Sequence, residues 1–119
     1  MRRAFALEAT VIMEAGADVR APGAAITVAL CGHWEHEPPC PLSPHHTAAE
    51  QSRDEVRLRV LFAAEPEQEA EVRGRIRAAL DRGGLEGPDG LTARWQLREA
   101  HPSRVRPDEE GHARRLTQT

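Results

Sequence analysis

The sequence contains no lysine, no tyrosine and few aromatic residues, which are Phe5, Trp34, Phe62 and Trp95. Because large rings are so scarce, the core must consist mainly of aliphatic side chains. The chain also lacks an excess of positive charge, since its formal net charge is −3 at pH 7. Proteins that bind nucleic acids usually have a strong basic excess, so we expect no nucleic-acid partner.

Long hydrophobic runs are absent as well. No run approaches the ~18 apolar residues that indicate a membrane-spanning helix, so we expect a soluble protein with no membrane partner. The first residues do not read as an export signal, because Glu8 and Glu14 interrupt the apolar stretch. Only two cysteines are present, Cys31 and Cys40. These features together predict a reduced chain in the cytoplasm.

Alternation of apolar and polar residues predicts four strands, at residues 4–14, 24–31, 55–63 and 91–99. The third strand has the clearest pattern. Val56, Leu58 and Val60 would point toward a core, and Arg57 and Arg59 would point away from it. A sheet with one buried face is therefore expected.

Residues 66–82 have the periodicity of an amphipathic helix. Val72, Ile76 and Leu80 recur at a spacing of four residues, so they would form one apolar face that packs on a sheet. Residues 47–50, Thr-Ala-Ala-Glu, match a capping box, which predicts a turn or a short helix there.

The expected order of elements is thus β-β-β-α-β, a four-stranded sheet with one main helix on one face. This α+β arrangement resembles the ferredoxin-like class in outline. We expect a single domain over residues 1–99, because a chain of 119 residues can bury one modest core. Residues 100–119 have little apolar content and no period, which predicts a polar C-terminal tail. One helix is narrow cover for four strands, so a homodimer could bury the remaining surface.

Residues 31–46, CGHWEHEPPCPLSPHH, contain both cysteines and four of the six histidines. Thiolates and imidazoles are good ligands for zinc and copper. The first four of these side chains could surround one ion as a tetrahedral set of two sulfur and two nitrogen ligands, and the last two histidines are spare ligands. The candidate metal ligands are Cys31, His33, His36, Cys40, His45 and His46.

Other interpretations of this segment remain open. The histidines could simply be solvated, Cys31 could be a small buried hydrophobic residue, and Cys31 and Cys40 could form a disulfide. A thiol beside an imidazole could also be a catalytic pair. However, the sequence has no recognisable oxyanion hole, phosphate loop or nucleophile elbow. We therefore expect a small metal-binding protein, with zinc favoured over copper, rather than an enzyme, and a plain interaction module is the alternative.

Overall fold

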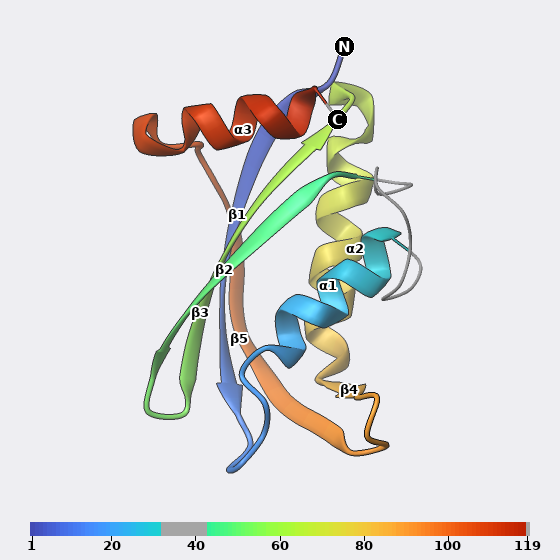
Figure 1. Cartoon of the computed structure of the whole chain (residues 1–119), viewed down its shortest axis with the longest axis vertical. Helices are drawn as coiled ribbons and strands as arrows, with labels where there is room; N and C mark the ends of the chain where they lie inside the picture. Colours follow the sequence, from blue (N-terminus) through green and yellow to red (C-terminus); the bar gives the residue numbers. More distant parts are fainter. Residues whose placement is uncertain (32–42, 119) are drawn as a thin grey trace.

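The computed structural model describes residues 1–31 and 43–118, and for Cys31 it describes only the backbone. In this part of the chain, three α-helices and one curled, five-stranded antiparallel sheet form an α+β fold (Figure 1). The strands are β1 (Arg3–Met13), β2 (His45–Ser52), β3 (Glu55–Ala64), β4 (Gly84–Glu86) and β5 (Thr92–Ser103). The helices are α1 (Ala21–Cys31), α2 (Glu69–Arg82) and α3 (Glu110–Thr117).

The expected four-stranded, ferredoxin-like sheet with one main helix is wrong. The described residues contain five strands in the order β2-β3-β1-β5-β4 together with three helices. Two segments account for most of the difference, because residues 24–31 lie in a helix and residues 47–50 lie in a strand.

α1 is apolar on every side, so its own sequence pattern does not select a helix over a strand. A short apolar run fits a buried helix as well as a strand, and periodicity cannot separate the two. In the folded chain Ile26 and Leu30 are one helical turn apart and both are fully buried. Pro22 lies in the first turn, where a missing N–H breaks no helical hydrogen bond.

β2 is a strand because it pairs with β3 along its whole length, from His45 opposite Phe62 to Ser52 opposite Glu55. A tight turn joins the two strands, with Arg53 in the left-handed region at a φ of 59°. The sequence of β2 has weak strand propensity, so the pairing with β3 overrides the local preference.

The expected strands at residues 4–14, 55–63 and 91–99 are confirmed as β1, β3 and β5, and the expected helix contains α2. Val72, Ile76 and Leu80 of α2 are fully buried against the sheet, as their spacing predicts. The ring N–H of Trp95 in β5 donates to the carbonyl of Leu80 at 2.8 Å. This bond ties the end of α2 to the sheet.

β5 extends beyond the expected domain boundary at residue 99 and ends at Ser103, and α3 follows. α3 packs on β1 and β3 at one end of the sheet (Figure 1), and Ala113 is buried in this contact. In the described ranges, no helix has the length and apolar character needed to cross a membrane.

Candidate functional site

The structure places the two spare ligands of the predicted metal site, His45 and His46, at the start of β2. Cys31 is the last residue of α1. The remaining candidates, His33, His36 and Cys40, lie outside the described residues.

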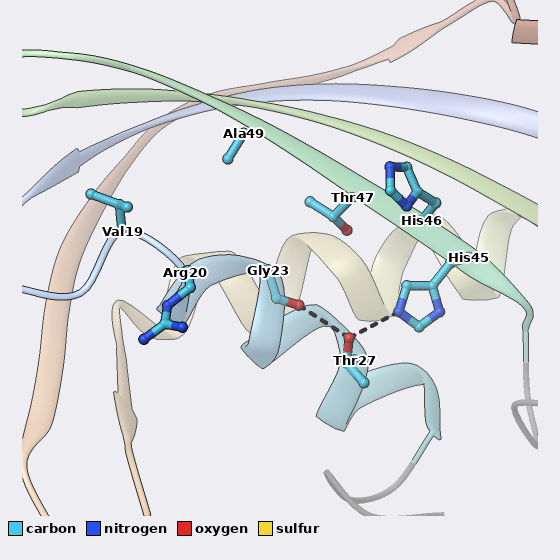
Figure 2. A pocket seen from close by; sticks show the side chains of 8 residues that line it. All are labelled: Val19, Arg20, Gly23, Thr27, His45, His46, Thr47 and Ala49. Atoms are coloured by element: carbon cyan, nitrogen blue, oxygen red, sulfur yellow. Dashed lines mark hydrogen bonds between the residues drawn. The ribbon is translucent and has the colours of Figure 1, made fainter. Parts of the chain in front are cut away.

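The side chain of His45, the first residue of β2, extends toward α1, and both of its ring nitrogens make hydrogen bonds. Its Nδ1 is 3.0 Å from the carbonyl oxygen of Ser43, and its Nε2 is 3.0 Å from the hydroxyl of Thr27 (Figure 2). A carbonyl oxygen can only accept, so Nδ1 must carry the hydrogen. In the neutral ring Nε2 then carries the lone pair and accepts from the Thr27 hydroxyl, whose single hydrogen is shared with the Gly23 carbonyl 3.3 Å away.

Ser43 is itself well fixed, which makes the position of His45 more definite. Its side chain is completely buried, and its hydroxyl donates to the carbonyl of Ala63 in β3 at 2.8 Å. The N–H of Ala63 in turn donates to the carbonyl of Pro44 at 2.9 Å. The entry into β2 is therefore anchored to the neighbouring strand immediately before His45.

His46 points to the opposite face of the sheet, because side chains alternate along a strand. Figure 2 shows His45 on the side of β2 that faces α1 and His46 on the other side. The ring of His46 packs against that of His112 in α3, with centroids 4.7 Å apart. Burial lowers the pKa of His112, and charge on His46 and on Arg115 lowers it further. Although both residues line the pocket described next, the His45 and His46 rings extend to opposite sides of β2 and are not placed to share one ion.

A pocket of about 370 Å³ lies between α1 and β2, beside His45 (Figure 2). The hydroxyl of Thr47 is buried in its wall and has no hydrogen-bond partner among the described residues. Gly23 of α1 lies opposite Thr47, and a Cβ at Gly23 would make an ordinary contact of 3.6 Å with the Thr47 methyl group. Among the described side chains, those of residues 1–30 and 43–118, no three of His, Cys, Asp or Glu are arranged to hold a metal ion. The candidate ligands Cys31, His33, His36 and Cys40 are not among these side chains.

A second polar cluster, on the other face of the sheet, is centred on Arg59. Its guanidinium donates to both carboxylate oxygens of Glu109 at 2.7 Å and to Glu8 at 2.8 Å. It also donates to the Ser103 hydroxyl at 2.9 Å and to the Arg104 carbonyl at 2.6 Å. These five contacts satisfy the guanidinium and attach the segment before α3 to the sheet.

The electrostatics of this cluster support a structural role. The hydrogen bonds from Arg59 lower the pKa of Glu109 to about 2, with a smaller contribution from the backbone N–H of Arg106. The side chains of Arg59 and Glu109 are only 12% and 16% exposed. Sequence periodicity predicted an outward-pointing Arg59 but gave no sign of this partner, which is far away in the chain.

Comparisons with known proteins do not assign the chain to a family. No protein-family model matches it, and no curated protein sequence is significantly similar to it.

Proposed function

We propose that this protein binds a transition metal, with zinc favoured over copper, through ligands of residues 31–46. The principal candidates are Cys31, His33, His36 and Cys40. His45 is the nearest further ligand, and the geometry of its ring is the observation that best supports the proposal. The metal would order this segment rather than carry out a reaction.

The ring of His45 is held in the form that metals bind. Metal-ligating histidines commonly donate their second ring N–H to a carbonyl or carboxylate, which fixes the tautomer and raises the basicity of the ligating nitrogen. The Ser43 carbonyl provides this contact to Nδ1 at 3.0 Å. An ion bound at Nε2 would replace the Thr27 hydroxyl there, and that hydroxyl would keep the Gly23 carbonyl, 3.3 Å away, as its acceptor.

The position of α1 supports the same proposal. Thr27 and Cys31 are four residues apart on α1, so they lie on the same side of the helix. The contact of 3.0 Å between Thr27 and His45 therefore brings the start of β2 within one helical turn of the residue that ends α1. His46 contacts His112 on the other face of the sheet, so our proposal gives it no part in the site.

The chemistry requires deprotonated thiols and neutral imidazoles. Reduced cysteines, as expected in the cytoplasm, are part of the proposal. Affinity for zinc should fall as the pH drops below about 6.5, because protons then compete for the histidine nitrogens.

Competition titration of the reduced protein against a chromophoric zinc chelator tests the proposal. We expect close to one zinc per chain, and binding at least ten times weaker in Cys31→Ser. His45→Ala should weaken binding, whereas His46→Ala is the matched control on the opposite face and should not. His101→Ala, an exposed residue of β5, is a second control. No stoichiometric zinc at neutral pH, or equal losses in all four variants, would refute the proposal.

A further inference from the structure

β2 is an edge strand of the sheet, and among the described strands only β3 pairs with it. The Ala63 N–H donates to the Pro44 carbonyl, which shows which residues of this antiparallel ladder bond toward β3. Because bonding alternates along the ladder, the backbone groups of His46, Ala48 and Glu50 also face β3. Those of the residues between them, including Thr47 and Ala49, point outward from the sheet.

Within the part of the chain that the structure describes, this outer edge has few of the features that prevent strands from pairing. It is eight residues long, contains no proline or lysine, and has Glu50 as its only acidic residue. Its register with β3 is regular and shows no bulge. Exposed edge strands normally carry such protection, because an open row of N–H and C=O groups is a template for another strand. From Ala48 to Ser52 every residue is exposed.

We propose that β2 pairs antiparallel with β2 of a second copy of this chain, so that two sheets join into one. We place the twofold axis at Ala48, because this register puts unlike side chains opposite each other. It places His46 opposite Glu50 of the second copy, and Thr47 opposite Ala49, so that each unlike pair occurs twice. Side chains that face each other across two strands stabilise the pairing when they carry opposite charges or form a hydrogen bond, and destabilise it when they carry like charges.

The outer side of α1 supports a second copy as the occupant. α1 has no charged residue over its eleven positions, and helices that are apolar all round are normally buried. Ala24, Val28 and Ala29 nevertheless remain partly exposed. α1 contacts β2, so the same axis would bring the α1 helices of the two copies toward each other on one face of the joined sheet.

The test is carried out on the full chain with reductant and a chelator, which excludes dimers bridged by a metal. Sedimentation equilibrium should show a monomer–dimer equilibrium at micromolar concentration. Hydrogen exchange measured for each amide by NMR should show protection of Thr47, Ala49 and Gln51 that increases with protein concentration. A monomer throughout, or a dimer in which these amides exchange freely, would overturn the proposal.

Substitutions in β2 test whether this strand forms the dimer interface. Ala48→Glu places two like charges against each other at the axis and should weaken dimerisation at least tenfold. Ala49→Pro removes an outward N–H, breaks no bond to β3 and should also weaken it. Leu91→Glu is the control, since it adds the same charge at an exposed residue outside β2. Protection of the β3 amides shows that each variant is folded. A dimer that survives both β2 substitutions, or that dissociates equally with Leu91→Glu, would contradict the pairing.

Discussion

Replacing Arg59 with methionine should destabilise the fold substantially, although this residue lies outside the hydrophobic core. Arg59→Met keeps an unbranched side chain of similar length but removes all five hydrogen bonds of the guanidinium. Glu109 then remains largely buried without its main partner. Breaking such a pair by removing one member is more destabilising than losing both members.

The magnitude follows from the pKa of Glu109, which is lowered from 4.5 to about 2. A shift of this size is worth about 3 kcal/mol, at roughly 1.4 kcal/mol per pKa unit. Small domains unfold with about 5–15 kcal/mol, so the variant should still fold but with a clearly lower free energy of unfolding. Arg75→Met is the matched control, because the Arg75–Glu71 pair is half exposed and such helix pairs contribute about 0.3–0.5 kcal/mol.

The pH dependence gives a second and independent readout. The folded pKa of Glu109 is lower than its unfolded value, so its contribution is complete above pH 4.5 and is lost as the pH falls toward 2. Urea unfolding followed by far-UV circular dichroism should therefore show a large difference between wild type and Arg59→Met at pH 7. The difference should shrink between pH 4.5 and pH 2. A loss no larger than that of Arg75→Met, or a loss independent of pH, would refute this reasoning.

Three further substitutions test how α2 is held. Gly83→Ala should lower the free energy of unfolding by ~1–3 kcal/mol, because Gly83 has a φ of 73° and a Cβ there would lie 2.7 Å from the Trp95 carbonyl oxygen. Gly16→Ala is its control and should cost less, because Gly16 has a φ of 79° but no atom lies within 4 Å of the added Cβ. Trp95→Phe should cost ~0.5–1.5 kcal/mol in urea unfolding, since it removes the indole donor but leaves the Leu80 carbonyl its 3.2 Å bond from the Gly83 N–H. Ile76→Asp should prevent folding, because it places an unpaired charge in a fully buried position, and a melting temperature near that of wild type would show that α2 is not docked as described.

Sequence alone determined the elements whose periodicity extends over many residues. β3 alternates from Glu55 to Phe62, and α2 repeats its apolar positions at Val72, Ile76 and Leu80. Such long patterns are reliable because each additional repeat agrees with one periodicity, that of a strand or that of a helix, and disagrees with the other. The same alternation correctly placed Arg59 on the polar face, since side-chain direction in a strand is a local property.

Tertiary contacts decided the elements with short or weak patterns. α1 is apolar on all sides, so only its packing against α2, β2 and β4 distinguishes a helix from a strand. β2 exists because β3 provides its hydrogen-bond partners. Once β2 is known to be a strand, the alternation of side chains separates His45 from His46, which the sequence treated as equivalent spare ligands.

Pairs of residues distant in the sequence were also beyond prediction from one chain. The bond between Thr27 and His45 requires α1 to lie beside β2, and the clamp between Arg59 and Glu109 requires the C-terminal segment to return across the sheet. The identities of these side chains show what chemistry is possible. Which of them meet depends on how helices and strands pack, and packing is set by the whole buried surface rather than by any local pattern.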